Sequence, residues 1–418
     1  MTSLAFWTTI ANYAAWYIFV FIAIMWLLVL LTNRERFSRE TGKKTKRLPG
    51  VSVLIPAHNE ENNIKMTLKS VLGLDYPKNL LEVIVIDDAS TDNTKDVVEG
   101  VKNVTLLVNK KNMGKARSLN RAIKIAKGEI IACIDADSTV DSKILKKMVG
   151  HFDDPEVACV TPALKVLKPK NFLEKIQAAE YLLNIFLRKS LDVIDSIHVT
   201  PGVFSVYRKS VLEEVGGFDE DNLTEDMEIA LRIHDAGYKI TNSLDAISYT
   251  ICPSSIRSLF KQRLRWYRGA LQNTAKYKHM IFRPKYGNLG MFLLPFNFIS
   301  IIAVITIFMF LFWNVFDTVS KFVWQLYLID WNFSVFLNKF EFDAQTLVLN
   351  TFTTPFVFML MGFLLGGYLL IKSFRITKEK IGLNKLGYIT YLIFYPLIMM
   401  SFWFTALAFE ILRVKRKW

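Results

Sequence analysis

The sequence predicts an α/β domain with a mainly parallel sheet, joined to α-helical spans that cross a membrane. Between Leu48 and Pro284, short β-branched runs alternate with longer segments of helical periodicity, which is typical of this fold class. Long apolar runs lie on both sides of that region. The composition agrees, because 52% of the 418 residues are hydrophobic and the mean hydropathy is +0.26, which is high for a wholly soluble protein.

The first apolar run, Leu4 to Leu31, contains no charged residue and is longer than the roughly 20 residues that cross a bilayer as a helix. A cleavable signal peptide is the alternative, but the run is too long and lacks a basic segment before it. We therefore expect residues 1–32 to form an uncleaved transmembrane helix. Basic residues follow it: Arg34, Arg36, Arg39, Lys43, Lys44, Lys46 and Arg47. The positive-inside rule then places the next domain in the cytoplasm, in a multi-pass protein of the plasma membrane.

The C-terminal part of the chain, residues 286–418, is predicted to form a membrane region of about three spans. Its apolar runs are Leu289 to Phe316, Thr351 to Ile371 and Leu386 to Leu412. Basic clusters follow the last two runs, at Lys372 to Lys385 and Arg413 to Lys417. The two clusters cannot both face the cytoplasm, so the topology of this region stays open, with re-entrant or interfacial segments as alternatives.

The charge and the cysteines limit the function classes. A formal net charge of +14 fits nucleic acid, anionic lipid or a phosphorylated substrate. Many basic residues flank apolar runs, which favours membrane lipids as partners, and no nucleic-acid partner is predicted. Cys133, Cys159 and Cys252 stand far apart, so neither a disulfide framework nor a metal-binding cysteine motif is expected.

The predicted strands end in polar residues. Val51 to Ile55, Leu81 to Ile86 and Glu129 to Ile134 are the clearest strands, and Glu60 to Leu72 and Ala116 to Ala126 have helical spacing and would connect them. The strands are followed by Pro56-Ala57-His58-Asn59-Glu60, Asp87-Asp88 and Asp135-Ala136-Asp137. Open α/β sheets bind ligands outside the carboxyl ends of their strands, so we expect these residues to converge on one crevice.

Asp135 and Asp137 form a candidate metal site. They are separated by one residue, so an extended backbone would point both carboxylates to one face, where they repel unless a cation lies between them. Carboxylate oxygens suit Mg²⁺ or Mn²⁺, which often share one or two protein ligands with substrate phosphates. The alternative is a solvated turn, since Asp-x-Asp is a short motif. Asp87 and Asp88 likewise have an alternative as a helix cap.

Five motifs resemble, in order, those of family 2 glycosyltransferases, which implies a GT-A fold over residues 48–250. The motifs are Val51-Ser-Val-Leu-Ile-Pro-Ala-His-Asn-Glu60, Asp87-Asp-Ala-Ser-Thr-Asp92, Asp135-Ala-Asp137, Thr224-Glu225-Asp226 and Gln262-Arg263-Leu264-Arg265-Trp266. The last is typical of processive synthases of cellulose, chitin, hyaluronan and poly-N-acetylglucosamine. The layout of one span before the domain and several after it looks most like bacterial poly-N-acetylglucosamine synthases.

The resemblance implies a role for each matching residue. The nucleoside would be held by Pro56, His58, Glu60, Asp87 and Asp88, with Lys115 near the nucleotide. Asp135 and Asp137 would serve ribose, diphosphate and Mn²⁺ or Mg²⁺. Asp226 matches the general base, while Glu225 would orient it or cap the following helix. Thr200 to Ser205 resembles the acceptor-side loop, where Gly202 would permit close approach of a sugar.

Residues 251–285 are predicted to form an amphipathic region at the membrane interface. Helical spacing places Gln262, Arg265 and Trp266 on one face, with Arg265 suited to the diphosphate and Trp266 to stacking on an acceptor sugar. We also include Arg263 among the substrate-binding residues. The alternative is a basic helix lying on anionic lipid, with charges from Lys261, Arg263 and Arg268. Its apolar stripe would be Ile256, Leu259, Phe260, Leu264, Tyr267 and Leu271, and a second stripe, at the interface or in the core, is Phe172, Ile176, Ala179, Leu183 and Phe186.

The resemblance implies an inverting transfer of a sugar from a UDP-sugar such as UDP-GlcNAc onto a growing polysaccharide, which the spans would translocate. Single addition to a lipid-linked acceptor is the alternative. A glycoside hydrolase would also use paired carboxylates, but the nucleotide-type α/β pattern and the basic helix argue against it. A transporter would explain the spans but not the carboxylates at strand ends. The sequence leaves the sugar, the linkage and any accessory subunit open.

Overall fold

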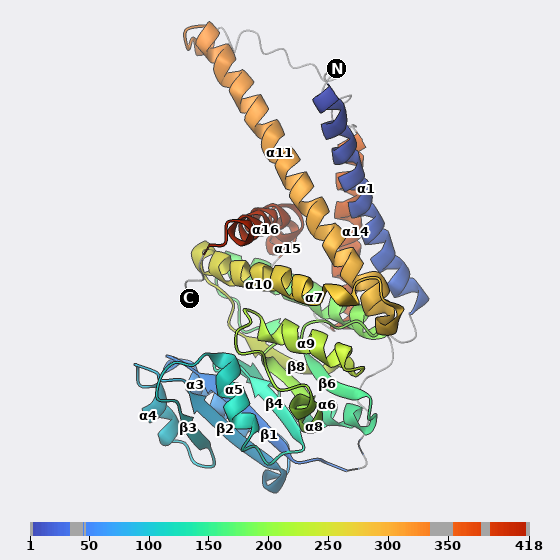
Figure 1. Ribbon diagram of the computed structural model, residues 1–418. Helices are drawn as coiled ribbons and strands as arrows, with labels where there is room; N and C mark the ends of the chain where they lie inside the picture. The colour runs from blue at the N-terminus through green and yellow to red at the C-terminus, as the bar shows by residue number, and fades with distance from the viewer. Residues whose placement is uncertain (1–2, 34–44, 46, 335–353, 378–384, 415–418) are drawn as a thin grey trace.

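The computed structural model describes residues 3–33, 45, 47–334, 354–377 and 385–414. It consists of an α/β domain from which long helices rise, with α7 (Phe172–Val193) and α10 (Ile256–Lys276) lying between the two parts (Figure 1). Several residues of the predicted basic clusters lie outside the described residues: Arg34, Arg36, Arg39, Lys43, Lys44, Lys46, Lys415, Arg416 and Lys417. The structure therefore does not test the orientation inferred from them.

The α/β domain is built on a sheet of eight strands in the order β3-β2-β1-β4-β7-β6-β8-β5. The strands are β1 (Val51–Ala57), β2 (Leu81–Asp87), β3 (Thr105–Val108), β4 (Ile130–Ile134), β5 (Ser138–Val140), β6 (Val157–Val166), β7 (Val203–Arg208) and β8 (Lys239–Thr250). Four neighbouring pairs are parallel, and β4–β7, β6–β7 and β5–β8 are antiparallel. The sheet is thus mixed, and the prediction of a mainly parallel sheet is not confirmed.

The direction of β7 follows from the path of the chain after α7. Val203 of β7 is the partner of Ile134, the last residue of β4, so the chain re-enters the sheet at the carboxyl edge and must run opposite to β4. The predicted strands agree closely with β1, β2 and β4, which lie side by side and parallel. Their carboxyl ends, which carry the polar residues named above, therefore meet at one edge of the sheet.

The central strands read as continuous apolar runs because both faces of the sheet are covered. Val53 and Ile55 of β1 belong to one buried cluster, with residues of α3 (Ile64–Leu72), and Leu54 belongs to another, with residues of α5 (Lys115–Ile123). The predicted connecting helices correspond to α3 and α5. The remaining helices of the domain are α4 (Thr94–Glu99), α6 (Ile144–Met148), α8 (Lys209–Glu214) and α9 (Glu225–Asp235), with 3₁₀ turns at Lys78–Leu80, Val149–Asp153, Lys278–Met280 and Pro284–Tyr286.

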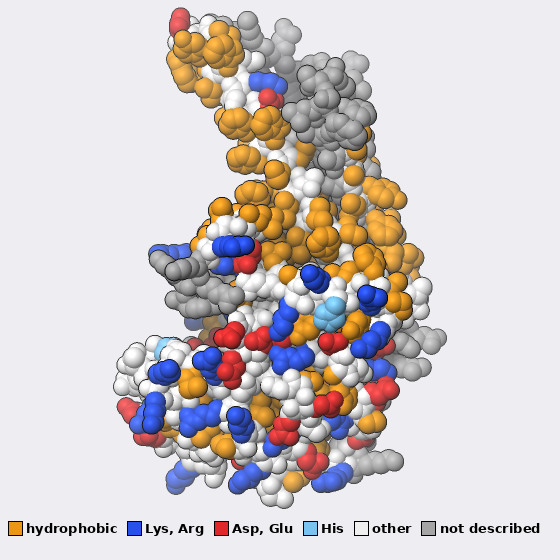
Figure 2. All heavy atoms as spheres, viewed as in Figure 1, with side chains coloured by type: hydrophobic (Ala, Val, Ile, Leu, Met, Phe, Trp, Pro, Cys, Tyr) orange, Lys and Arg blue, Asp and Glu red, His pale blue; other side chains and the backbone are white. Residues whose placement is uncertain are grey.

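The long helices outside the domain are mostly apolar. They are α1 (Ser3–Thr32), α11 (Leu294–Leu328, preceded by the π-helical turn Leu289–Leu293), α14 (Thr354–Ile376), α15 (Lys385–Ile393) and α16 (Tyr395–Ile411). Within the described residues, Leu289–Leu328 is one helix long and apolar enough to cross a membrane, and α15 with α16, bent by 42°, would form a second such segment. Hydrophobic side chains gather over these helices, whereas charged side chains gather over the α/β domain (Figure 2). The number of spans stays a prediction.

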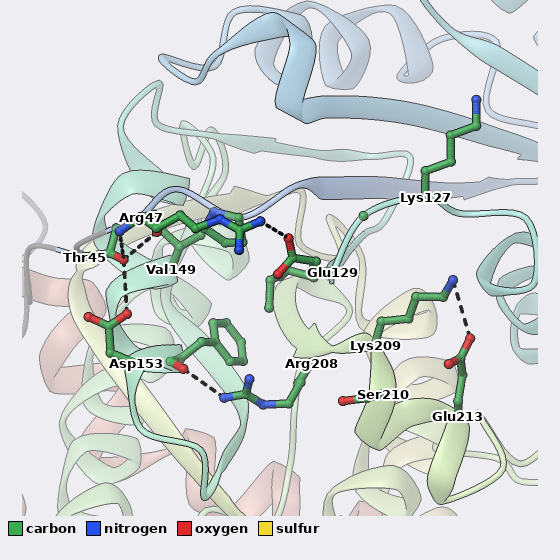
Figure 3. Close-up of a pocket in the computed structure, with 14 residues that line it drawn as sticks. Thr45, Arg47, Lys127, Glu129, Val149, Asp153, Arg208, Lys209, Ser210 and Glu213 are labelled. Atoms are coloured by element: carbon green, nitrogen blue, oxygen red, sulfur yellow. Dashed lines mark hydrogen bonds and ion pairs between the residues drawn. The ribbon is translucent and has the colours of Figure 1, made fainter.

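A cavity of about 540 Å³ lies near the amino ends of β1 and β4 (Figure 3). Ionic and polar contacts cross its wall. Arg47 Nη2 lies 2.9 Å from Glu129 Oε1, Thr45 Oγ1 donates to Asp153 Oδ1 at 3.1 Å, and Arg208 Nη2 donates to the carbonyl of Phe152 at 2.9 Å. The contacts of Thr45 and Arg47 fasten the segment that precedes β1 to the α/β domain, at the sheet edge opposite the polar strand ends.

Helix α10 touches the start of α9 closely at Gly269. A Cβ atom at Gly269 would lie 2.9 Å from the Thr224 Cβ and would overlap the rest of that side chain. Asn273, one turn further along α10, is buried and donates from Nδ2 to Thr224 Oγ1 at 3.0 Å. The absence of a side chain at Gly269 therefore sets the separation between α10 and the loop that begins α9.

We expect Gly269→Ala to lower stability by roughly 1–3 kcal/mol, because an overpacked contact forces the two elements apart. Thermal unfolding of the purified protein in detergent measures this change. Gly100→Ala is the matched control, since a Cβ there would meet only ordinary contacts at 3.7 Å from two carbonyl oxygens. An unchanged unfolding midpoint for Gly269→Ala would contradict the inferred tight contact.

Candidate active site

A cavity of about 820 Å³ opens at the carboxyl edge of β1 and β4 and extends to α7, α10, α11 and α16. Its charged wall is mostly acidic. The carboxylates that line it are Glu60, Asp88, Asp135, Asp137, Glu225 and Asp226, and the lining Lys and Arg residues are Lys115, Arg188 and Arg265. Most predicted site residues meet here: Pro56, His58, Glu60, Asp88, Lys115, Asp135, Asp137, Gly202, Glu225, Asp226, Gln262, Arg265 and Trp266. Asp87 and Arg263 are not part of this lining.

Asp88 organises the loop that precedes α5. Its carboxylate accepts hydrogen bonds from the backbone N–H of Met113 at 2.9 Å and of Gly114 at 2.8 Å, and from Asn109 Nδ2 at 2.7 Å. The Asp88 carbonyl lies 2.9 Å from His58 Nδ1, and a carbonyl only accepts, so Nδ1 carries the proton. Asp88 therefore holds both His58 and the loop that delivers Lys115, instead of serving only as a helix cap.

Lys115 joins two of the acidic motifs. Its Nζ lies 2.6 Å from Asp135 Oδ1 and 3.0 Å from Glu225 Oε1. Burial alone would lower the pKa of Lys115, but the negative charges of Asp135 and Glu225 outweigh it and hold the pKa well above its usual range. A Cβ at Gly202 would lie 2.9 Å from Asp135 Oδ1 and would overlap the Lys115 ammonium. Gly202 thus leaves room for this ion pair, and the close approach of a sugar at this glycine stays a prediction.

Asp135 and Asp137 fit a divalent cation that substrate phosphates help to bind. Burial raises the pKa of Asp137 to about 6, and the nearby charge of Asp135 adds to the effect, so these two carboxylates repel each other. Within the described part of the chain, no group of three or more His, Cys, Asp or Glu side chains is placed to hold a metal. The carboxylate pair would therefore supply only part of a coordination shell, as Mg²⁺ sites on nucleotide diphosphates commonly do.

Asp226 and Glu225 differ in environment although they are neighbours. Burial and, to a smaller extent, the charge of Glu225 together raise the pKa of Asp226 to about 6. Burial also acts on Glu225, but Lys115 and Arg265 outweigh it and lower the pKa of that carboxyl. The Asp226 carbonyl accepts from Thr200 N at 3.1 Å and Thr200 Oγ1 at 2.8 Å, so the loop containing Gly202 is fastened to the start of α9. Asp226 is the carboxyl better suited to exchange a proton near neutral pH.

Helix α10 brings three motif residues to the cavity and turns two arginines into the protein. Gln262, Arg265 and Trp266 line the cavity, and Arg265 Nη1 donates to the Leu223 carbonyl at 3.2 Å. Arg263 is buried and lies 2.6 Å from Glu180 Oε2, while Arg268 pairs with Glu410. The structure therefore places Arg263 outside the predicted substrate contacts. These two arginines also do not form the lipid-facing charge of the alternative interpretation, because both have internal carboxylate partners.

Several cavity residues were missed by sequence reasoning. Tyr181, Asn184, Ile185 and Arg188 of α7 line it, as do Asn297, Ser300, Ile301 and Val304 of α11, His198 and Trp403. The signals were weak but present. Asn184 and Arg188 are four residues apart in a helix whose apolar stripe we had predicted to lie at the interface or in the core, and Asn297 and Ser300 interrupt an apolar run at helical spacing.

Comparisons with known proteins identify the family and the fold of the domain that contains this cavity. Residues 52–216 match Glycosyl transferase family 2. The fold is that of GT-A glycosyltransferases: the mannosyltransferase PcManGT from Pyrobaculum calidifontis, solved in complex with GDP-Man and Mn²⁺, superposes with a TM-score of 0.63 at 21% identity over 99% of each chain. The chain therefore carries a family 2 glycosyltransferase domain.

Two relatives are similar to this chain over a longer segment than the family match. The chain is 33% identical over 264 residues to the poly-beta-1,6-N-acetyl-D-glucosamine synthase of Staphylococcus epidermidis, which covers 60% of this chain and 63% of that protein. The enzyme of the same name from Staphylococcus aureus (strain MSSA476) is 33% identical over 261 residues, with the same coverage. The aligned part thus spans slightly less than two thirds of each relative.

Gly202→Ala should lower the rate of glycosyl transfer at least about tenfold, because the added methyl group displaces the Lys115 ammonium from its place beside Asp135, and a small misplacement of a group in an active site can cost on the order of 10²-fold. The unfolding midpoint should change little, since the end of a flexible side chain can move aside. Enzyme assays and thermal unfolding on the same preparation separate the two effects, with Gly100→Ala as the control. Unchanged kinetics would contradict the role given to this glycine.

Proposed function

We propose that this protein is an inverting glycosyltransferase that moves a sugar from a UDP-sugar, of the UDP-GlcNAc class, onto a growing polysaccharide. One observation carries the proposal: the carboxylates at the strand ends, the start of α9 and the Gln262, Arg265 and Trp266 face of α10 line the same cavity. The family 2 domain supports sugar transfer, and the named activity of the staphylococcal relatives supports the polymer product. The catalytic domain would work at the cytoplasmic face of the plasma membrane, with membrane lipids around the apolar helices.

The donor would bind with its nucleoside beside His58, Glu60 and Asp88. Asp135 and Asp137 would hold Mn²⁺ or Mg²⁺, which when bound neutralises charge on the diphosphate. Lys115 and Arg265 line the same cavity and add fixed positive charge to it. Without a cation the lining carboxylates outnumber the lining Lys and Arg residues, which opposes binding of an anionic diphosphate.

The chemical step would use Asp226 as the general base. The hydroxyl of the acceptor sugar attacks C1 of the donor sugar, its proton passes to the Asp226 carboxylate, and the bond from C1 to the diphosphate oxygen breaks as UDP leaves. A single displacement of this kind inverts the configuration at C1. Arg265 stabilises the departing diphosphate, and Trp266 supplies an aromatic surface for the acceptor ring.

The far end of the cavity suits a sugar chain. Asn297, Ser300, Ile301 and Val304 follow the spacing of one helical face of α11, and Tyr267 of α10 stacks on Trp403 of α16 with ring centroids 4.1 Å apart. Amide, hydroxyl and aromatic groups are the usual partners of sugars, so this wall supports translocation of the polymer along the helices. The apolar Ile301 and Val304 also fit the alternative, a single addition to a lipid-linked acceptor.

The test measures release of the nucleoside diphosphate by the purified protein in lipid. The donors are a panel of UDP-sugars and one GDP-sugar, each with Mn²⁺, Mg²⁺ or a chelator. We expect turnover of one UDP-sugar, loss of at least about 90% of the rate in chelator if the cation neutralises the diphosphate, and a high-mass product on a sizing gel. One sugar added to a lipid carrier would favour the alternative. Release of a nucleoside diphosphate from no donor would refute the transferase assignment, and turnover of the GDP-sugar alone would refute the UDP-sugar donor.

We expect the rate to fall as the pH is lowered through about 6, because Asp226 must be deprotonated to accept a proton and its pKa lies near that value. Asp226→Asn should reduce kcat about 10²- to 10⁴-fold, the usual contribution of a general base. Glu225→Gln is the neighbouring comparison and should move the acidic limb to lower pH, because the charge of Glu225 helps to raise the pKa of Asp226. An acidic limb that is absent in the wild type would argue against Asp226 as the base.

A further inference from the structure

A buried ion pair with a phenol joins three helices behind Trp266. Arg263 of α10 is 1% exposed, and its Nη2 lies 2.6 Å from Glu180 Oε2 of α7. The hydroxyl of Tyr395, the first residue of α16, donates to the same Glu180 oxygen at 2.8 Å and lies 3.4 Å from Arg263 Nη2. Arg263, Glu180 and Tyr395 are called the buried triad below.

The guanidinium of the buried triad also touches the acceptor-side aromatic residue. The Arg263 Cζ atom lies 4.1 Å from the centroid of the Trp266 ring, a cation–π contact within the usual range. Trp266 lines the cavity, whereas Arg263 does not. One face of the indole is thus covered by the guanidinium, which leaves the rest of the ring for a ligand in the cavity.

Stability alone does not explain this arrangement. The cost of desolvation offsets much of the attraction in a buried ion pair, so apolar residues in its place often stabilise a protein equally well. Moreover, Arg263 Nε and Nη1 are buried and have no hydrogen-bond partner among the described residues, so the guanidinium is incompletely satisfied. Its planar shape is instead what the stacking on Trp266 requires, since a lysine ammonium would reach Glu180 without covering a ring.

The triad connects Trp266 to a bend in the membrane helices. Tyr395 follows directly on the 42° break between α15 and α16, and α16 also contributes Trp403 to the cavity wall. Glu180 lies on α7, one residue before Tyr181, which lines the cavity as well. A change in the angle at this break would therefore move Tyr395 relative to Arg263. Through the contact of Arg263 with the ring, it would also change the orientation of Trp266.

We propose that Arg263, held by Glu180 and Tyr395, is a positioning residue that sets the orientation of Trp266 for the acceptor sugar. The inference rests on the proposed function, because it requires Trp266 to bind the acceptor. It assigns Arg263 an indirect role in place of the direct substrate contact expected from the motif.

The experiment compares Tyr395→Phe, Glu180→Gln and Arg263→Lys with the wild type in lipid. The readouts are KM for the donor, KM for a soluble oligosaccharide acceptor, and UDP release without acceptor. We expect the acceptor KM to rise about 3- to 30-fold, the range of a desolvated cation–π contact, while donor KM and acceptor-free release stay within about twofold. Tyr395→Phe removes one hydroxyl, so it guards against misfolding of the charge variants.

Arg268→Lys is the matched control, because Arg268 lies on the same helix and pairs internally with Glu410 but has no assigned part in the cavity. It should leave the acceptor KM unchanged. A second readout needs no turnover: the fluorescence of Trp266, taken as the difference between each protein and its Trp266→Phe counterpart, should change in Arg263→Lys and not in Arg268→Lys.

The outcomes separate the two proposals. A selective rise in acceptor KM together with an altered Trp266 signal supports the positioning role. Equal effects on donor and acceptor, equal effects of Arg268→Lys, or an unaltered Trp266 signal would overturn it. If the wild type releases UDP from no donor, the transferase function fails, and the fluorescence difference still decides whether Arg263 orients Trp266.

Discussion

The excess of negative charge in the large cavity is the constraint on which the other features of the site depend. Carboxylates from four parts of the chain, the ends of β1, β2 and β4 and the start of α9, face one space, and like charges at short range in a partly buried site repel strongly. The Lys115 ammonium offsets part of this repulsion by bridging Asp135 and Glu225, and Gly202 leaves room for it. A divalent cation would offset part of the remaining excess, so that an anionic diphosphate could bind beside these carboxylates.

A second requirement is that α10, which lies between the α/β domain and the long apolar helices (Figure 1), keeps its place over the start of α9. Three features do this: the close approach at Gly269, the hydrogen bond from Asn273 to Thr224, and the hydrogen bonds that Glu228, a fully buried carboxylate of α9, accepts. Lys276 Nζ and the Tyr277 hydroxyl both donate to Glu228 Oε1 at 2.7 Å. Since α10 also packs on α16, the cavity wall that these two helices form and Asp226, the proposed general base, belong to one continuous packed unit. This explains how side chains on different layers could act on the same sugar.

The parts of the structure that sequence reasoning predicted are those with local signals. A strand buried on both faces and followed by carboxylates marks its own ligand edge, which is why β1, β2, β4 and the residues after them were found. The antiparallel course of β7 and the inward turn of Arg263 depend on partners far away in the chain. Glu180 lies 83 residues from Arg263, and its negative charge can pair with Arg263 only once α7 and α10 are packed together. Without that pairing, a basic residue in an amphipathic helix reads equally well as a contact to lipid or to substrate. The cavity residues of α7 were missed for the same reason, because the side of a helix opposite its apolar stripe is predicted to face water unless another layer covers it.

The acidity of Asp226 links this organisation to stability. Its pKa is raised from the ordinary 3.8 to about 6 by burial and by Glu225, so the folded protein binds a proton there more tightly than the unfolded chain does. Stability therefore falls as the pH rises between those two values and remains lowered above them, because the ionised carboxylate has lost solvation that the fold does not replace. A ligand that binds only the folded state stabilises it by mass action, and one that brings cationic charge or a hydroxyl donor to this wall would restore part of the lost solvation. The carboxylate thus costs the empty protein stability in the pH range in which it can serve as a base, which is the pattern expected of a residue retained for chemistry and not for packing.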